Sequence, residues 1–332
     1  MRDMIPELND LLETARVVAL PMTTRFRGVD VREALLLEGP EGWAEFSPFA
    51  EYPDAEASAW LAAALDYGWT PQPAPRRPVV GVNATVPAVP AERVAAVLGR
   101  FPGCRTAKVK VAERGQTLDH DVARVRAVRT ALGPEGRIRI DANGAWNVDE
   151  GERALHALAG FDLEYAEQPC ATVTELAELR MRVKYMGIPL AADESIRRAT
   201  DPIAVARSGA ADLVVIKAQP LGGIRRALRI VAEAGLPAVV SSALDTAVGL
   251  GQGTMLAAAL PGLEYDCGLG TGALFVQDVA DLSPHDGAIP AGRVAPDPGR
   301  LDRLAAPPDR REWWLERLAR CHALLTASTG SV

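Results

Sequence analysis

Apolar and polar residues follow two different patterns along this chain, and the change falls near residue 103. Beyond that point, short β-branched segments alternate with longer amphipathic ones, which is typical of repeating strand and helix units. Strands are predicted at residues 105–111, 137–142, 163–168, 189–194, 212–217, 237–242 and 263–267. Helices are predicted between them, at 118–132, 150–158, 174–185, 202–208 and 223–234.

This repeat predicts an α/β fold in which helical crossovers join parallel strands. About seven such units can close into a barrel or lie in an open, doubly wound sheet. Because no glycine-rich dinucleotide-binding loop accompanies the repeat, a barrel is favoured, and the open sheet is the alternative.

The first 100 residues show a different pattern, with β-rich segments first and helical ones after them. Strands are expected at 17–20, 34–37 and 43–46, with a hairpin turn at 39–42, and helices at 54–66 and 90–100. After a stretch rich in Pro and Gly, a helix near 311–325 is expected to pack back on the N-terminal part. The predicted division is an N-terminal α+β domain (1–100), a barrel (101–282) and a C-terminal segment (283–332) returning to the first domain.

Composition narrows the possible partners. The net charge is −7 and no cluster of Lys and Arg occurs, so we expect a small-molecule substrate and no nucleic acid. The four cysteines lie far apart in the sequence, which argues against a disulfide framework or a zinc site and fits a cytoplasmic location. The first apolar run, at 17–20, ends at Pro21 and is too short for membrane insertion. A monomer and a homo-oligomer both remain open.

The predicted strands end in charged residues. In a barrel, the C-terminal ends of the strands converge on one mouth, where active sites lie. The strand ends carry Lys108 and Lys110, Asp141 and Asn143, Glu167, Asp193, and Lys217. Asp141, Glu167, Asp193 and Lys217 follow one another at intervals of 26, 26 and 24 residues, one strand-helix unit each. Three carboxylates on successive strands supply the hard oxygen ligands that suit Mg²⁺.

Lysine is rare in this chain, which makes its positions informative. Only residues 108, 110, 184 and 217 are lysines, and three of these four stand at strand ends. Arginine keeps its proton in a protein, whereas a buried lysine near a metal can have its pKa lowered and exchange protons. The strand-end lysines therefore indicate proton transfer, while Lys184 is expected on the surface of a helix.

Each strand-end acid taken alone has a simpler explanation, since such residues often cap a helix or face solvent. Their joint occurrence at the same point of a regular repeat favours a site. Other candidates are weaker. Gly222 stands at the start of a helix, where glycine serves either to face an anion or to meet a steric need. Ser242 ends a strand, where serine either contacts substrate or caps the next helix. The four histidines show no spacing that suggests shared ligands.

The motifs Lys108-x-Lys110, Asp141-x-Asn143, Glu167-Gln168-Pro169, Asp193-Glu194 and Lys217 together resemble the muconate lactonizing subgroup of the enolase superfamily. The resemblance spans nearly the whole chain. It implies an α+β capping domain over a modified TIM barrel of the (β/α)₇β type. The shared chemistry of that superfamily is removal of a proton alpha to a carboxylate, which gives an enediolate.

The resemblance also implies roles for the matching residues. Lys110 and Lys217 would be acid/base groups on opposite faces of the substrate. Lys108 would hold the substrate carboxylate or act on Lys110 as a neighbouring like charge, and Asn143 would support the metal site. The ligands of Mg²⁺, for which Mn²⁺ could substitute, would be Asp141, Glu167 and Asp193.

Within this subgroup, segments 24–28 and 43–49 are most similar to actinobacterial o-succinylbenzoate synthases of menaquinone biosynthesis. These lyases remove water in syn fashion from 2-succinyl-6-hydroxy-2,4-cyclohexadiene-1-carboxylate to give 2-succinylbenzoate. The similarity implies that Lys110 acts as base and then as acid, while Lys217 contributes its charge. Arg25 or Arg27 would then meet the succinyl carboxylate.

Two alternatives remain. An N-acylamino acid racemase or dipeptide epimerase would use the same five residues, with both lysines exchanging protons with the substrate. A non-catalytic metal-binding barrel is the alternative from another class, and the lysine pair argues against it because structure alone does not require deprotonatable groups there.

Overall fold

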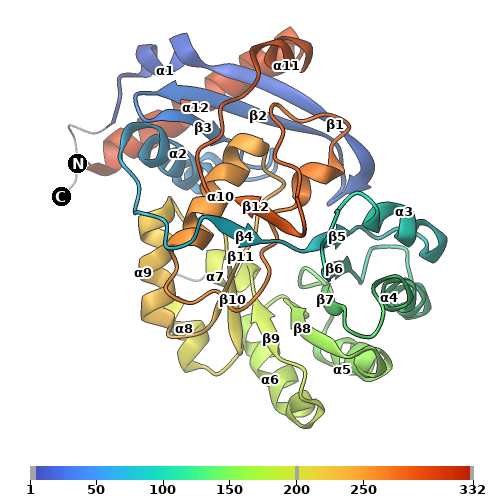
Figure 1. The fold of residues 1–332 in the computed structure, drawn as a ribbon. Coiled ribbons are helices and arrows are strands. Elements are labelled where there is room, and N and C mark those ends of the chain that lie inside the picture. The colour runs from blue at the N-terminus through green and yellow to red at the C-terminus, as the bar shows by residue number, and fades with distance from the viewer. Residues whose placement is uncertain (1–4, 199–201, 330–332) are drawn as a thin grey trace.

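A small α+β part lies above a barrel of parallel strands in this protein (Figure 1). The computed structural model describes residues 5–198 and 202–329 of the 332. The predicted α/β class, a modified barrel with an α+β capping domain, is confirmed.

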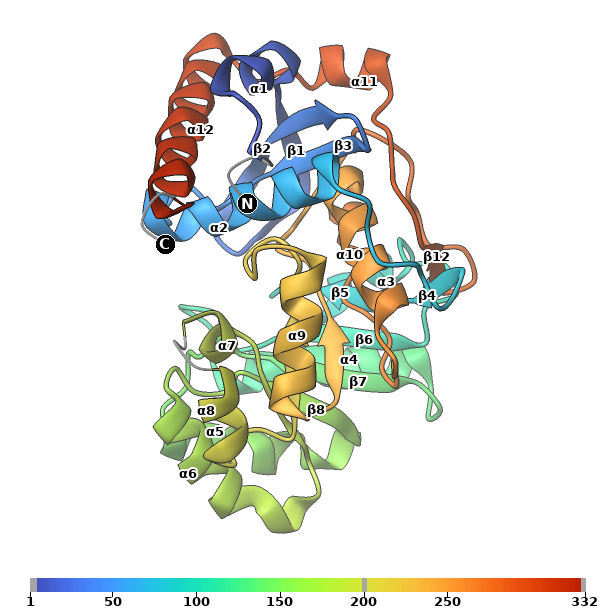
Figure 2. The same cartoon turned by 90° about the vertical axis from the view of Figure 1, so that its left-hand side faces the viewer.

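The capping part is built on an antiparallel sheet of β1 (Arg16–Phe26), β2 (Val29–Gly39) and β3 (Gly42–Phe46). The predicted hairpin turn is confirmed between β2 and β3. A side chain at Gly39 would collide with the carbonyl oxygen of Gly68, so this turn requires glycine. Helices α1 (Leu8–Thr14) and α2 (Asp54–Trp69) pack against the sheet, and α12 (Pro308–Thr329) packs against α2 (Figure 2).

In the described part of the chain, the barrel sheet has seven parallel strands in sequence order. They are β5 (Ala84–Val86), β6 (Thr106–Lys110), β7 (Arg137–Asp141), β8 (Leu163–Glu167), β9 (Leu190–Ala192), β10 (Leu213–Ile216) and β11 (Ala238–Val240). The segment 267–268 closes the barrel, because Cys267 pairs with Val82 before β5 and Gly268 pairs with Ser241 after β11. An eighth extended segment in this place gives the (β/α)₇β arrangement.

Helices connect the strands and cover the outside of the barrel. They are α3 (Val94–Leu98), α4 (Leu118–Leu132), α5 (Val148–Leu158), α6 (Val173–Val183), α7 (Glu194–Arg198), α8 (Pro202–Arg207), α9 (Ile224–Ala234) and α10 (Ala247–Ala259). Short 3₁₀ turns occur at η2 (Ala91–Arg93), η3 (Ala159–Phe161), η4 (Lys184–Met186) and η5 (Thr271–Leu274). Helices α5 and α6 each begin with a capping box, Asn147 with Glu150 and Thr172 with Glu175, which explains where these helices start.

Alternation along the strands separates two apolar clusters. On β10, Val214 and Ile216 belong to the large core shared with the surrounding helices. Leu213 and Val215 belong instead to a small cluster inside the barrel, together with Tyr165, Ala191 and Val239. Because successive side chains point to opposite faces, the barrel interior has its own apolar layer below the polar strand ends.

The C-terminal segment returns to the capping part. Strand β12 (Ala288–Pro290) pairs with β4 (Val79–Gly81), and α11 (Pro298–Arg303) leads to α12. Arg310 on α12 pairs with Glu33 on β2 at 2.7 Å, and Trp314 donates to the same carboxylate at 2.8 Å. The helix is thus fixed to the sheet by polar contacts as well as by its apolar face.

The predicted domain ranges differ from these elements at one point. Strand β5 pairs with β6 in the barrel sheet although it lies within the predicted capping range 1–100. The predicted barrel range, 101–282, therefore omits the first strand, which is only three residues long. Residues 1–4 and 330–332 of the predicted ranges lie outside the described residues. Among residues 5–198 and 202–329, no helix is both long and apolar enough to cross a membrane.

The packing of α12 generates a stability prediction. Leu318 on α12 is fully buried, whereas Leu324 on the same helix is 40% exposed. We expect Leu318→Ala to lower the free energy of unfolding by about 2–5 kcal/mol, because it leaves a cavity between α12 and the capping core. Urea unfolding measures this, with Leu324→Ala as the matched control. Equal effects of the two substitutions would contradict the packing described.

Candidate active site at the barrel mouth

Charged side chains gather where strands β6 to β10 end. Lys110 ends β6, Asp141 ends β7 and Glu167 ends β8, while Asp193 and Lys217 directly follow β9 and β10. The sheet register places Lys110 beside Asp141, and Asp141 beside Glu167. Even spacing along the chain thus becomes side-by-side contact at the mouth, and the structure brings these five predicted residues together.

Each carboxylate of the site faces a lysine. Lys108 Nζ lies 3.0 Å from Glu167 Oε1 and 3.2 Å from Asp141 Oδ2. Lys110 also pairs with Asp141, and Lys217 pairs with Asp193. None of these side chains is more than 13% exposed. Three ammonium groups therefore lie among the three carboxylates in a buried layer.

Burial and mutual repulsion shift the protonation of these groups. Burial and, after it, the neighbouring Asp141 carboxylate raise the pKa of Glu167 to about 7. Burial also acts to raise the pKa of Asp141, but the ammonium groups of Lys110 and Lys108 outweigh it and hold that pKa below its ordinary value. Of these two carboxylates, Glu167 is the one that the lysines stabilise less.

Lys108 differs from the expectation of a lowered lysine pKa. Burial acts to lower its pKa, but the facing carboxylates of Glu167 and Asp141 outweigh burial and raise the pKa above its ordinary value. In this arrangement Lys108 is a fixed positive charge between two carboxylates.

The three carboxylates offer the donor set that Mg²⁺ prefers, namely hard oxygens with room for further oxygen ligands. Among the described residues, no three His, Cys, Asp or Glu side chains surround one point as metal ligands do. Asp141, Glu167 and Asp193 are each involved with a lysine instead. Their chemistry fits a divalent cation, because the repulsion that raises the pKa of Glu167 is what a cation between the carboxylates relieves.

Two amide side chains orient the charged groups. Asn143 accepts from Lys110 Nζ at 2.5 Å and donates to Glu194 at 3.2 Å. Gln168 accepts from the backbone N–H of Asp193 at 2.9 Å. Both Asn143 and Gln168 have left-handed backbones, with φ of 48° and 38°, a strained conformation that tends to mark functional sites.

A hollow of about 40 Å³ adjoins the charged layer. The capping part contributes Phe26, Arg27 and Phe49 to its lining, and the Phe26 ring centroid lies 5.4 Å from Lys110 Nζ. A neighbouring hollow of about 180 Å³ is also lined by Phe26, Arg27, Lys110 and Asn143. The site is therefore formed by barrel and capping part together.

The two candidate arginines occupy different places. Arg25 lines only the neighbouring hollow, is 68% exposed, and pairs with Asp30 at 3.6 Å. Arg27 lines both hollows; its guanidinium stacks on Phe49 at 4.2 Å and donates to Tyr52 Oη at 2.7 Å. Arg27 is thus the arginine that the structure brings to the site.

Ser242 and Gly222, two further residues expected at the site, also lie in different places. Ser242 lines the inner hollow, and its hydroxyl lies 2.7 Å from Thr271 Oγ1. Gly222 does not line either hollow within the described residues. Its φ is 79°, a conformation that favours glycine, and a Cβ there would lie 3.3 Å from Arg226 Nη1 on α9.

Sequence reasoning did not single out several lining residues, among them Thr85, Phe49 and Thr271. The sequence pattern around Thr85 could have indicated its place, because Thr85 is a lone polar residue between Ala84 and Val86 in a short strand. Alternate side chains of such a strand face the barrel interior. No sequence pattern could have indicated Phe49, since its position depends on how the capping sheet packs on the barrel.

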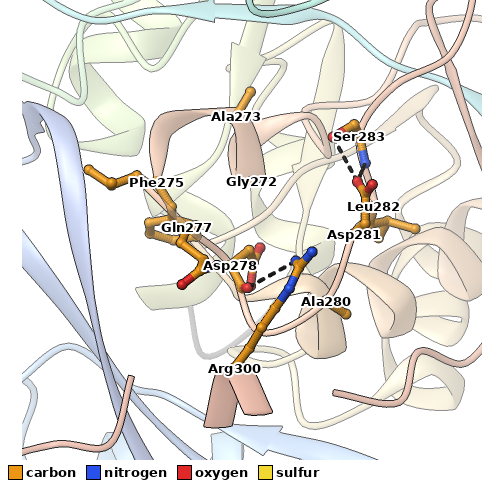
Figure 3. A pocket seen from close by; sticks show the side chains of 11 residues that line it. Gly272, Ala273, Phe275, Gln277, Asp278, Ala280, Asp281, Leu282, Ser283 and Arg300 are labelled. Carbon is orange, nitrogen blue, oxygen red and sulfur yellow. Dashed lines mark hydrogen bonds between the residues drawn. The ribbon is translucent and has the colours of Figure 1, made fainter. Parts of the chain in front are cut away.

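A larger hollow, of about 340 Å³, lies elsewhere, next to α11 (Figure 3). Its polar groups are engaged with one another: Arg300 donates to the carbonyl oxygen of Asp278 at 3.2 Å, and Ser283 Oγ donates to Asp281 at 2.9 Å. Its described lining includes no lysine and none of the three barrel carboxylates. This hollow is larger than the one at the barrel mouth, but it lacks the charged residues of the candidate active site.

Comparison with known families supports the architecture. A family described as enolase C-terminal domain-like matches residues 91–299, and one described as enolase N-terminal domain-like matches residues 17–68. An o-succinylbenzoate synthase of Mycolicibacterium smegmatis is 56% identical over 98% of this chain and 100% of its own length. The enzyme of that name from Mycobacterium ulcerans is 57% identical, over 97% and 98%.

Solved structures of low identity share the fold. A muconate lactonizing enzyme from Pseudomonas fluorescens, complexed with muconolactone, has a TM-score of 0.74 at 20% identity and covers 88% of this chain and 98% of its own. A dipeptide epimerase from Enterococcus faecalis, complexed with Mg and the dipeptide L-Leu-L-Tyr, has a TM-score of 0.70 at 20% identity, with coverages of 85% and 97%. At this identity the likeness concerns the fold alone.

Proposed function

The chain belongs to the enolase superfamily and, within it, to the o-succinylbenzoate synthases, and we propose that it forms 2-succinylbenzoate with Lys110 as the proton-transfer group. The observation that carries the proposal is the set of three carboxylates on β7 to β9, flanked by Lys110 on β6 and Lys217 after β10. Relatives that are 54–57% identical over nearly the whole chain bear that enzyme name.

The reaction removes one water from 2-succinyl-6-hydroxy-2,4-cyclohexadiene-1-carboxylate. Lys110, in its neutral form, takes the proton from the ring carbon that bears the carboxylate, and the electron pair moves into an enediolate. The same lysine then gives the proton to the hydroxyl group on the adjacent carbon, which leaves as water while the ring becomes aromatic. One lysine suffices because both groups leave from the same face.

The remaining residues bind and compensate charge. Lys217 stays protonated across the site from Lys110, and its ammonium group opposes the negative charge that develops on the substrate. Lys108, between Asp141 and Glu167, pairs with the substrate carboxylate. Mg²⁺ bound by Asp141, Glu167 and Asp193 would supply positive charge next to that carboxylate and make the adjacent C–H more acidic.

The succinyl group ends in a second carboxylate that requires its own cation. Arg27 is the arginine that lines the inner hollow, and its guanidinium already lies over an aromatic ring, as in many ligand sites. We assign the succinyl carboxylate to Arg27 rather than to Arg25, whose side chain is exposed and paired with Asp30.

The racemase and epimerase alternatives draw less support. Proteins with such names are found among solved structures about 20% identical to this chain, which share only its fold. No contact in the described residues favours them over the synthase.

The proposed reaction is tested with purified protein and the cyclohexadiene substrate. We expect aromatic product with Mg²⁺, and a loss of at least about 100-fold in rate when EDTA removes divalent cations, because charge stabilisation is lost. Absorbance of the product reports the rate, and added Mg²⁺ should restore it. Equal rates with EDTA would contradict the metal site. Absent turnover, with deuterium exchange at the alpha carbon of an N-acylamino acid, would establish the racemase instead.

The arginine assignment is tested by a matched pair. We expect Arg27→Met to raise KM for this substrate about 10–100-fold, because a charge-assisted hydrogen bond is lost. Arg25→Met should change KM less than about threefold. Steady-state kinetics of both variants measure the difference, and a larger effect at Arg25 would reverse the assignment.

A further inference from the structure

The capping sheet contacts the barrel at the beginning of α10, which lies between the two parts in Figure 2. The first N–H groups of a helix have no partners within the helix. Here the N–H groups of Thr246 and Gly249 each donate to Glu45 Oε2 on β3 at 3.0 Å. A residue of the capping sheet thus completes a helix that belongs to the barrel.

Glu45 is held from both sides. It is 1% exposed and also accepts from Thr246 Oγ1 and from Ser47 Oγ, both at 2.5 Å. Carboxylates are stabilised at helix N-termini, where the helix dipole and free N–H groups carry positive charge. The buried charge of Glu45 is therefore compensated by the helix that it caps.

A second capping residue reaches the segment just before α10. Arg32 on β2 is 3% exposed and donates to the carbonyl oxygens of Leu244 at 3.0 Å and of Ala243 at 3.4 Å. Leu244 has φ of 62°, a left-handed conformation that a leucine rarely adopts and that neighbouring contacts must maintain.

This held segment is also a wall of the site. Ser241, Ser242, Ala243 and Leu244 all line the inner hollow, where Lys217 also lies. These four residues therefore face the hollow on one side, and two of them accept hydrogen bonds from the capping sheet on the other. The shape of this wall therefore depends on how the capping part packs on the barrel.

The contact at Glu45 leaves no spare room. A Cβ at Gly249 would lie 2.8 Å from Glu45 Oε2 and 2.8 Å from Gln219 Nε2, so an alanine there would push the carboxylate away from the helix. Asp245, 5% exposed, lies close enough that Glu45 adds to the raising effect of burial on its pKa, which is about 7.

We propose that Glu45 is a positioning residue for substrate binding. By capping α10 from the capping sheet, it fixes the position of residues 241–244, which form a wall of the hollow. In the part of the chain that the structure describes, its hydrogen bonds go to none of the three metal ligands, so it acts through the start of α10 and the segment before it. Substrate affinity should therefore depend on Glu45, whereas proton transfer by Lys110 and metal binding on β7 to β9 should not. The kinetic part of this inference rests on the proposed synthase reaction.

The test compares Glu45→Met, which keeps the bulk and removes the acceptors, with Glu45→Gln, which keeps one acceptor oxygen for the helix. We expect Glu45→Met to raise KM at least about tenfold while kcat changes less than about threefold, since the lost hydrogen bonds hold only the wall. Glu45→Gln should bring KM back to within about threefold of the unchanged protein. Mg²⁺ affinity, measured by calorimetry, should stay the same in all variants.

Two further variants and a hydrogen-exchange measurement complete the test. Gly249→Ala should reproduce the KM effect even if Glu45→Met does not fold, and Glu38→Met, at an exposed position of β2, should change nothing. Hydrogen exchange of residues 241–249 should become at least about tenfold faster in Glu45→Met and Gly249→Ala, a readout that needs no activity and separates this inference from the proposed reaction. Unchanged exchange, or a fall in kcat at constant KM, would overturn it.

Discussion

Three carboxylates buried side by side repel one another, and the site depends on how that repulsion is balanced. The strand register fixes Asp141 next to Glu167, and burial deprives both of solvent. Lysines at the ends of β6 and after β10 supply the opposing charge, yet the pKa of Glu167 still rises to about 7 because of burial and Asp141. An arrangement with negative charge left to stabilise favours a divalent cation, and with it the chemistry of acidic C–H groups beside a carboxylate.

The capping part supplies side chains that line the hollow and others that support its wall. Phe26 and Arg27 border the hollow from above, while Arg32 and Glu45 hold the wall from behind. The C-terminal helix α12 in turn fixes the sheet that carries these residues, through Glu33 and the apolar core. Chain segments far apart in sequence thus determine one small cavity, whose barrel side supplies charge and whose capping side supplies shape.

The barrel and its charged residues could be predicted because both follow from local patterns. A strand-helix unit repeats about every 25 residues, and the strand ends share one mouth, so evenly spaced acids must meet. Strand β5 was missed because three residues are too short to show a period, and Thr85 was missed with it. The contacts of Glu45 with the start of α10 join residues about 200 positions apart, for which no local pattern exists.

In the proposed reaction the two lysines have different tasks, with proton transfer at Lys110 and charge at Lys217. Substitution of each by arginine tests this most directly, because arginine retains the charge but cannot give up a proton. Lys110→Arg should lower kcat by at least about 1000-fold, which lies within the range of about 100- to 10,000-fold for a lost general acid/base. Lys217→Arg should lower kcat less than about tenfold, with both variants folded and binding Mg²⁺. Equal losses in the two variants, or the reverse order, would contradict this division of tasks between the lysines.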